Sequence, residues 1–293
     1  MTTNSKLISN YTYKKMFLPN VSRHDLFNFS SLQSYRIERY LKHIVIPVTP
    51  YQTTFNFFIF VTKGWIKQQL ENSVFEVKAN GAINIRQGNY TATLELSDDV
   101  EGYFVVYENE IIDKIVLNSK DLNFFYTSPF LIVKEKTISW IIGIFELLEE
   151  ELRDIESNQT ICILLFESIL LKIIRAENKN YQALSHMSSI SFHFRELVHK
   201  HHVEHKEIGF YAQKLNLSDN YLNKCVKETT GKPPKQWINE ISILHSQILL
   251  QDNSLEIAQI AFELNYQSPS YFSRLFKKIT GLTPTAYRSS KSS

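Results

Sequence analysis

The sequence is poor in cysteine, in long apolar runs and in net charge. Only two of its 293 residues are cysteines, and the formal net charge is +2. Cys162 and Cys225 are far apart and both fall on apolar helical patterns, so we expect buried thiols and no disulfide framework of the secreted kind. The strongest apolar stretches, 140–145 and 161–166, are far below the roughly 20 residues that a membrane-spanning helix needs. The first residues lack the apolar core of a signal peptide, and we therefore expect a cytoplasmic protein without membrane contact.

The small net charge is unevenly distributed along the chain. Residues 190–293 hold 13 Lys and Arg against 9 Asp and Glu, a net of +4, which leaves −2 for residues 1–189. This is the sign expected of a nucleic-acid-binding part at the carboxy-terminal end, although the excess is mild. The length is sufficient for two domains.

The chain contains one pattern written twice, at 207–237 and 257–287. The opening halves of the two copies align at an offset of 49 and the closing halves at an offset of 50. Self-similarity of this kind marks a duplicated structural unit. Each half carries apolar residues at i, i+3, i+4 and i+7, which form one face of a helix. Each copy is therefore predicted to be two amphipathic helices joined by a tight turn.

The residues between these helices also indicate a helix, a turn and a second helix in each copy. Asn216 and Asn265 stand where each first helix should stop, because asparagine tolerates the left-handed conformation that ends a helix. Ser218 and Ser268 follow as candidate caps for each second helix. Glycine and then proline close both second helices, as is typical of helix ends.

The second helix of each copy keeps polar side chains once its apolar stripe is removed. In the first copy these are Asn220, Asn223, Lys224 and Lys227, and in the second they are Ser270, Tyr271, Ser273, Arg274, Lys277 and Lys278. An α-helix fits the major groove, where asparagine pairs with adenine, arginine or lysine with guanine, and serine with several bases. The lysines further along are better placed for phosphates. A merely solvated face remains the alternative for one helix, but two matching copies favour DNA.

A third helix is predicted between the two copies. Residues 234–251 carry apolar side chains at helical spacing, so this segment would be about 27 Å long. Successive major-groove faces on one side of DNA lie ~34 Å apart. A connecting helix of this size could hold each unit at its own groove.

The run at 257–288, IAQIAFELNYQSPSYFSRLFKKITGLTPTAYR, resembles the carboxy-terminal motif of AraC/XylS-type transcriptional regulators. The resemblance covers about residues 187–290 and implies a double helix-turn-helix that binds promoter DNA, usually for activation with RNA polymerase as a partner. By matched position it implies base contacts from Asn220, Asn223, Lys224, Ser270, Tyr271, Ser273 and Arg274. The predicted phosphate contacts are Ser218, Lys227, Ser268, Lys277 and Lys278. The sequence departs from the family at Asn265, where glycine is usual, and at Cys225 or Val226, where a larger apolar residue is usual.

The amino-terminal half is predicted to consist of short strands. The candidate strands are 35–39, 42–47, 55–62, 65–70, 73–78, 82–86, 91–96 and 101–107. Many short strands of even spacing favour a small barrel or jelly roll, and their order resembles the cupin-type sensor barrel of the same family. The predicted fold class is thus a two-domain α+β protein. Its domains would be 1–176, with two helices after the barrel, and 189–293, joined by a polar linker at 177–188.

A barrel of this size could enclose a small effector. The candidate pocket residues are Phe55, Phe57, Phe60 and Trp65, although aromatic residues on strands are more often ordinary core. No catalytic role is expected, because a metal-dependent cupin needs clustered His and carboxylate ligands and this region has only His24 and His43. The run HKHHVEH at 199–205 offers no closed tetrahedral set, so we expect no metal and no cofactor.

Two helices are predicted after the barrel, at 137–153 and 159–175. The second is apolar almost all round, so every side of it must be covered. One explanation is burial against the barrel, and the other is a homodimer interface that includes Leu164 and Leu171. The sequence leaves both open.

Two functions remain possible at this point. The favoured one is a transcriptional regulator that responds to a small effector bound in the barrel. In the alternative, the amino-terminal domain only dimerises or binds protein partners. The sequence does not identify the effector, the promoter or the direction of regulation.

Overall fold

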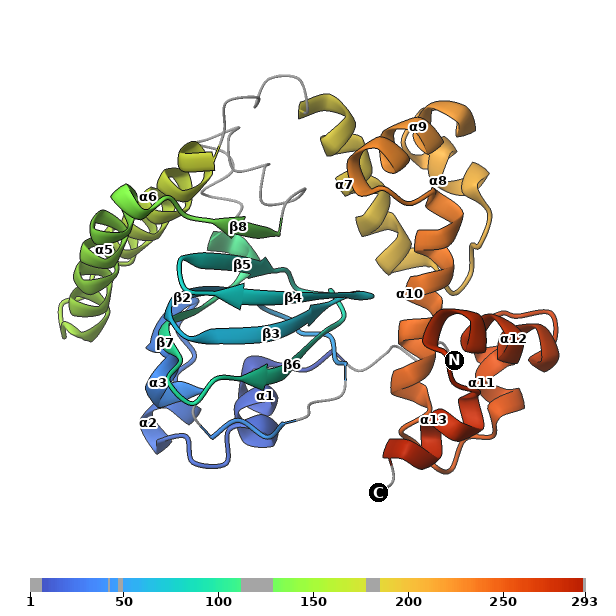
Figure 1. The fold of residues 1–293 in the computed structure, drawn as a ribbon, viewed down its shortest axis with the longest axis horizontal. Helices are drawn as coiled ribbons and strands as arrows, with labels where there is room; N and C mark the ends of the chain where they lie inside the picture. The colour runs from blue at the N-terminus through green and yellow to red at the C-terminus, as the bar shows by residue number, and fades with distance from the viewer. Residues whose placement is uncertain (1–6, 42, 47–49, 112–128, 178–184, 292–293) are drawn as a thin grey trace. The chain divides into compact units, whose positions relative to one another are not determined.

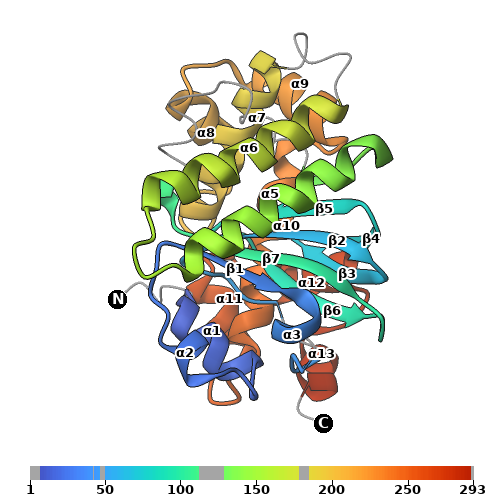
Figure 2. The same ribbon diagram turned by 90° about the vertical axis from the view of Figure 1, so that its left-hand side faces the viewer.

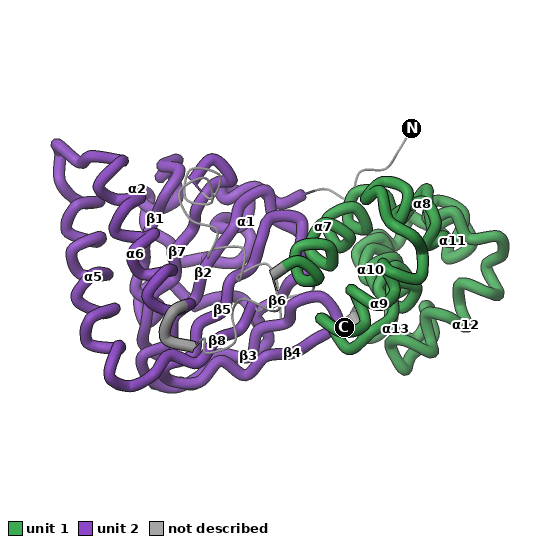
Figure 3. Tube along the Cα trace, turned by 90° about the horizontal axis from the view of Figure 1, so that it is seen from above, with its two compact units in different colours: residues 1–6, 49–51, 186–293 green, residues 7–48, 52–185 purple. Residues whose placement is uncertain are grey.

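The computed structural model describes residues 7–41, 43–46, 50–111, 129–177 and 185–291. The chain divides into two compact units, one built from residues 7–48 and 52–185 and the other mainly from residues 186–293 (Figure 3). The expected organisation, strands and then helices followed by an all-helical part, is observed. α6 ends at Glu177 and α7 begins at Ser185, so the centre of the predicted linker lies outside the described residues.

The amino-terminal unit begins with short helices and continues with strands (Figure 1). The helices are α1 (Asn10–Phe17), α2 (Arg23–Leu26) and α3 (Ile37–Tyr40). The strands are β1 (Leu32–Arg36), β2 (Asn56–Lys63), β3 (Trp65–Leu70), β4 (Ser73–Lys78), β5 (Gly81–Ile85), β6 (Thr91–Leu96), β7 (Glu101–Tyr107) and β8 (Phe130–Ile132). Six of the eight predicted strands are thus confirmed to within one residue at each end.

The predicted strands at 35–39 and 42–47 are wrong. β1 ends at Arg36, and the chain then turns into α3. Ile37, Tyr40 and Leu41 are all buried, and their spacing of three and four residues puts them on one side of a helical turn. The described residues 43–46 contain no strand. Burial of a helical stripe against the sheet therefore overrode the β-propensity of this segment.

The described strands form two antiparallel sheets. The five-stranded sheet has the order β1-β7-β2-β5-β8, and the three-stranded sheet has the order β4-β3-β6. Within the described residues, β1 and β8 are edge strands, so the larger sheet is not closed into a barrel. The coarse prediction of a β-rich amino-terminal part is confirmed, but a closed barrel is not observed.

Two long helices, α5 (Glu135–Arg153) and α6 (Gln159–Glu177), cover one face of the five-stranded sheet (Figure 2). The Phe145 ring from α5 stacks on Tyr103 of β7, with ring centroids 4.0 Å apart. Phe166 from α6 lies 5.2 Å from the ring of Tyr107. These aromatic contacts belong to one continuous apolar core, which fixes both helices to the sheet.

The carboxy-terminal unit is helical throughout (Figure 1). Its helices are α7 (Ser185–His201), α8 (Ile208–Lys214), α9 (Asp219–Thr230), α10 (Pro234–Leu249), α11 (Ile257–Glu263), α12 (Pro269–Thr280) and α13 (Pro284–Lys291). The repeat therefore folds as predicted, into two helix-turn-helix units with α10 between them. Both cysteines are free and buried, as expected. Among the described residues, none of the helices is long and apolar enough to cross a membrane.

Candidate nucleic-acid interface

The turns of the two helix-turn-helix units have the same backbone geometry. Asn216 and Asn265 adopt the left-handed conformation, with φ of 55° and 56°. In the first turn the Leu217 N–H donates to the Ala212 carbonyl at 2.9 Å, and in the second the Tyr266 N–H donates to the Ala261 carbonyl, also at 2.9 Å. This bond, from the third residue past the helix to the third residue from its end, is typical of a Schellman motif. The asparagine that departs from the family's glycine thus makes the same turn.

The second helices of the two helix-turn-helix units, α9 and α12, are here called the recognition helices. They begin and end alike. The Ser218 Oγ accepts the Tyr221 N–H at 3.3 Å, and the Ser268 Oγ accepts the Tyr271 N–H at 3.2 Å. Both serines therefore cap a helix, as predicted, while each hydroxyl hydrogen stays available to donate to a phosphate. Each helix ends on a left-handed glycine, Gly231 or Gly281.

The apolar stripe of each recognition helix is buried. Leu222, Cys225 and Val226 of α9 are fully buried, so the smaller residues of the first unit still pack without exposure. In α12 the buried pair is Phe272 and Phe276, whose ring centroids lie 5.8 Å apart. Burial of one stripe determines which side chains of each helix remain available for binding.

Most of the predicted contact residues are exposed. Among the predicted base contacts, Asn220, Lys224, Ser270, Tyr271 and Arg274 are exposed, whereas Asn223 and Ser273 are half-buried. Lys227, Lys277 and Lys278, predicted to contact phosphates, are exposed as well. The Asn223 Nδ2 donates to the Asp219 carbonyl at 3.0 Å, so one of its two N–H donors is used within α9. The assignment of contacts to bases and phosphates stays a prediction.

The two recognition helices differ in charge, a difference that the predictions from sequence did not include. α9 contains Asp219 and Glu228 beside Lys224 and Lys227, and its formal charge is zero. α12 contains Arg274, Lys277 and Lys278 and no carboxylate. The signal was present in the repeat, because Glu228 aligns with Lys278 at the offset of 50. We expect α12 to supply more of the attraction to phosphates.

α10 is shared by the two units. Its 16 residues correspond to about 24 Å, slightly shorter than predicted. Ile238 and Ile241 are buried, and α10 contacts α9. Ile243 of α10 and Leu250, which directly follows this helix, enter the apolar core of the second unit together with Phe272 and Phe276. The same helix thus contributes to both cores.

A polar cluster, here called the brace, joins the segment after α7 to α10 and to the second helix-turn-helix unit. The Lys206 Nζ donates to the His202 carbonyl at 2.9 Å and to the Ser242 Oγ of α10 at 3.0 Å. It lies 4.4 Å from the centroid of the Tyr266 ring, which follows the turn of the second unit. Burial lowers the pKa of Lys206 to about 8, so at neutral pH the brace is built around a charged ammonium group.

The centre of the brace contains two buried histidines. The His202 Nδ1 lies 3.0 Å from the Val198 carbonyl, so it carries the proton, and its Nε2 accepts from the His245 Nδ1 at 3.0 Å. Burial lowers the pKa of both imidazoles well below their usual range, and a neighbouring cation, Lys206, lowers that of His245 further. His202 belongs to the HKHHVEH run, for which the sequence predicted no metal site. Within the described residues, no group of three or more His, Cys, Asp or Glu side chains could hold a metal ion.

The predicted effector-pocket residues lie mainly in the core. Phe55, Phe57 and Phe60 are buried, and Phe57 stacks on Phe104 at 5.3 Å. Trp65 is half-buried, with the Lys67 Nζ 5.1 Å from its ring. A cavity of about 570 Å³ opens elsewhere in the same unit and is lined by none of these four residues. Their contact with an effector stays a prediction.

The two candidate dimer residues differ in exposure. Leu164 is 52% exposed on α6, whereas Leu171 is half-buried and packs against the core formed by α5, α6 and the sheet. Burial within the unit therefore accounts for most of α6, whereas Ile161 and Leu164 are exposed. A homodimer interface on this helix stays a prediction.

Comparisons with known proteins agree with this architecture. The family described as "Helix-turn-helix domain" matches residues 211–290. YisR of Bacillus subtilis (strain 168), described as an uncharacterized HTH-type transcriptional regulator, is 26% identical over 125 residues, which are 43% of this chain and 42% of YisR. The Msm operon regulatory protein of Streptococcus mutans is 30% identical over 94 residues, 32% of this chain and 34% of that protein. The HTH-type transcriptional activator RhaR of Salmonella arizonae is 31% identical over 78 residues, 27% of this chain and 28% of RhaR.

The chain thus matches less than half the length of these curated relatives. Among solved structures, ToxT from Vibrio cholerae is similar with a TM-score of 0.46 and 20% identity, covering 88% of this chain and 98% of that chain. The fold and the family match together define a tandem helix-turn-helix domain at residues 211–290. This domain belongs to the AraC/XylS type, as the resemblance in the sequence implied.

Proposed function

We propose that this chain is a sequence-specific DNA-binding transcriptional regulator that acts in the cytoplasm and activates promoters in response to a small effector. The observation that carries the proposal is the pair of recognition helices. Both have a serine N-cap, follow the same type of turn and end on a left-handed glycine. They share one connecting helix and expose amide, hydroxyl and cationic side chains. Side chains of this kind pair with base edges when a helix lies in the major groove.

Each of the two helices would contact both base edges and phosphates, through different side chains. Residues in their first turns, such as Asn220 and Ser270, and in the middle turn, such as Arg274, would contact base edges. Lys227, Lys277 and Lys278 would contact phosphates, which position the protein without specifying the sequence. Arg274 is exposed and has no carboxylate of α12 beside it, so its fork of donors is available for a guanine.

The amino-terminal unit would sense the effector and assemble the protein. We infer a cupin-like sensor whose two sheets take the place of a closed barrel, with a domain boundary at 177–188. The cavity in this unit favours effector binding over the alternative in which the unit only dimerises or binds protein partners. Leu164 supports a homodimer contact through α6, and RNA polymerase would be the partner at the promoter.

A map of the chromosomal sites that the full chain occupies in cells, followed by binding to one such fragment in vitro, tests this function. We expect enrichment at promoters and an affinity at least about a thousandfold above that for a scrambled fragment. A variant with Lys224→Glu and Arg274→Glu is the matched control, because both side chains are exposed and the fold should persist. Equal affinity for the two fragments, or equal binding by the variant, would contradict the proposal.

A further inference from the structure

The cavity of about 570 Å³ lies beside α2, β1, α3 and the last turn of α5. Small-molecule sites in proteins commonly have volumes of about 300–1,000 Å³. Unlike most such sites, this one is lined largely by polar and charged side chains. The charges and hydrogen-bond donors of the lining therefore determine which class of ligand the cavity can bind.

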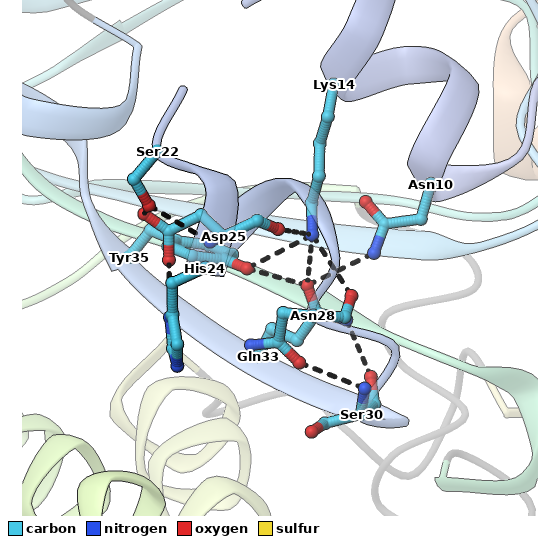
Figure 4. Close-up of polar contacts among 9 residues, drawn as sticks. All are labelled: Asn10, Lys14, Ser22, His24, Asp25, Asn28, Ser30, Gln33 and Tyr35. Atoms are coloured by element: carbon cyan, nitrogen blue, oxygen red, sulfur yellow. Dashed lines mark hydrogen bonds and ion pairs between the residues drawn. The ribbon is translucent and has the colours of Figure 1, made fainter. Parts of the chain in front are cut away.

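Figure 4 shows a lysine, Lys14, surrounded by residues that line the cavity. Lys14 comes from α1, and its side chain is fully buried. Its Nζ lies within hydrogen-bond distance of four neutral oxygen atoms, more than its three hydrogens need: the carbonyls of Asp25 at 2.6 Å and Asn28 at 3.2 Å, the Gln33 Oε1 at 2.9 Å and the Tyr35 hydroxyl at 3.3 Å. Burial lowers the pKa of Lys14 to about 8, with the Asp25 charge opposing that shift. At neutral pH Lys14 is therefore mostly charged, and among the described residues no carboxylate oxygen accepts a hydrogen bond from it.

Residues that surround Lys14 also line the cavity. The Gln33 Oε1 also accepts from the Tyr35 hydroxyl at 2.7 Å, and the Gln33 Nε2 donates to the Ser30 carbonyl at 2.7 Å. Asn28, Ser30, Gln33 and Tyr35 all line the cavity. This part of the lining is therefore a hydrogen-bonded network around a buried cation, and the network forms without a ligand.

Three arginines line the cavity as well. The Arg36 Nε donates to both oxygens of Glu149, at 2.8 and 3.1 Å, and its guanidinium lies 4.2 Å from the Tyr103 ring centroid. An Arg153 Nη lies 3.8 Å from the same carboxylate. Within the described residues, the Nη hydrogens of Arg36 have no acceptor, and the exposed Arg39 has none either. The Glu149 carboxylate is thus shared by the guanidinium groups of Arg36 and Arg153, and the guanidinium of Arg39 has no carboxylate in contact among the described residues.

The carboxylates of the lining are already occupied. An Asp25 oxygen accepts from the Ser22 hydroxyl at 2.7 Å, and Glu149 accepts from Arg36. Three arginines against two carboxylates leave one positive charge in excess, in addition to the charge of Lys14. Guanidinium groups bind carboxylates and phosphates through paired N–H donors, which a neutral ligand cannot match.

We propose that this cavity binds a small hydrophilic anion, with a carboxylate or phosphate group held by Arg36, Arg39 and Arg153. The inference deepens the proposed function, on which it rests, by making such an anion the effector. The anion would draw Arg36 and Arg153 away from Glu149. Because Glu149 and Arg153 belong to α5, occupancy of the cavity would change the attachment of α5 to β1.

Isothermal titration of the full chain at constant ionic strength tests this site with citrate, inorganic phosphate and glucose 6-phosphate, with glucose as the neutral comparison. We expect at least one anion to bind and glucose not to bind. Arg39→Gln and Arg153→Gln should each weaken binding of that anion about tenfold or more, because each removes a charge-assisted hydrogen bond. Both side chains are exposed, so both variants should fold. Lys136→Gln, an exposed cation of α5 outside the lining, should leave the affinity unchanged.

The inference is overturned if none of the three anions binds, if Arg39→Gln binds as tightly as the unchanged chain, or if Lys136→Gln weakens binding equally. Promoter binding by the same preparation separates the two proposals. Intact DNA binding without anion binding refutes this site alone. Anion binding that follows the arginines, together with absent DNA binding, refutes the proposed function and leaves the site standing.

Discussion

Arg274 and Lys277 lie one turn apart on the exposed side of α12, yet we expect them to contribute differently. Arg274→Ala should weaken binding by about 1–3 kcal/mol for the preferred sequence and relax discrimination at one base pair. Lys277→Ala should weaken binding to all sequences alike and reduce the slope of log affinity against log salt by about 1. Affinities for a set of single-base variants at several salt concentrations check both. A uniform loss in both mutants would refute the assignment.

His202 and His245 make the stability of the carboxy-terminal unit sensitive to acid. Burial lowers the pKa of both imidazoles in the folded state, so between the ordinary value near 6.5 and the lowered value the unfolded chain binds more protons. The stability that neutral histidines confer is therefore present above about pH 6.5 and is lost as the pH falls below it. The loss is at most about 1.4 kcal/mol per pH unit for each histidine.

Unfolding of the full chain by urea at pH 7 and pH 5 measures this effect. The double variant His202→Gln, His245→Gln should be less stable than the unchanged chain at pH 7, but it should lose less stability on acidification. His186→Gln is the control, because that side chain is exposed. An unaltered pH slope in the double variant would show that other groups cause the acid sensitivity.

At the scale of elements, α6 has two exposed apolar positions, Ile161 and Leu164, that packing within the unit does not explain. Leu164→Glu should leave the melting temperature nearly unchanged and convert a dimer to a monomer, because Leu164 is 52% exposed. Leu171→Glu should instead lower stability by several kcal/mol, since it places a charge against the core. Solution mass and melting temperature distinguish the outcomes. Met16→Glu, at an exposed position of α1, is the control, and a Leu164→Glu protein that stays dimeric would refute the interface.

The elements also differ in how far local pattern predicts them. The helices of the repeat follow from apolar spacing, serine caps and left-handed asparagines, all of which act within a few residues. The segment of α3 was predicted as a strand, because Ile37, Tyr40 and Leu41 favour both structures and only burial against the sheet selects the helix. α1 carries an N-cap, Ser9, but its core-facing Tyr13, Lys14 and Phe17 gave no sustained stripe.

At the scale of the whole DNA-binding unit, two recognition helices must keep a fixed separation. The brace supports this separation, because Lys206 contacts the segment after α7, α10 and the second turn at once. Lys206→Met keeps most of the length but loses the cation–π contact and the donated bonds, so it should cost roughly 1–2 kcal/mol of stability. It should also make the protein more tolerant of altered spacing between half-sites.

Affinity for a natural site and for the same site with one inserted base pair tests the brace. The ratio of the two affinities should be smaller for Lys206→Met than for the unchanged chain. Lys200→Met, an exposed lysine of α7, should keep the ratio. If the ratio stays the same in both variants, α10 alone sets the separation.

The tandem helix-turn-helix was determined by the sequence alone, because its caps, turns and apolar stripes depend on nearby residues and occur in both copies of the repeat. The tertiary structure alone decided the brace and the anion cavity. His202 meets His245 across 43 positions, and Arg36 meets Glu149 across 113. Such pairs have no period and no motif, and only the packing of helices and strands brings their donors and acceptors within reach.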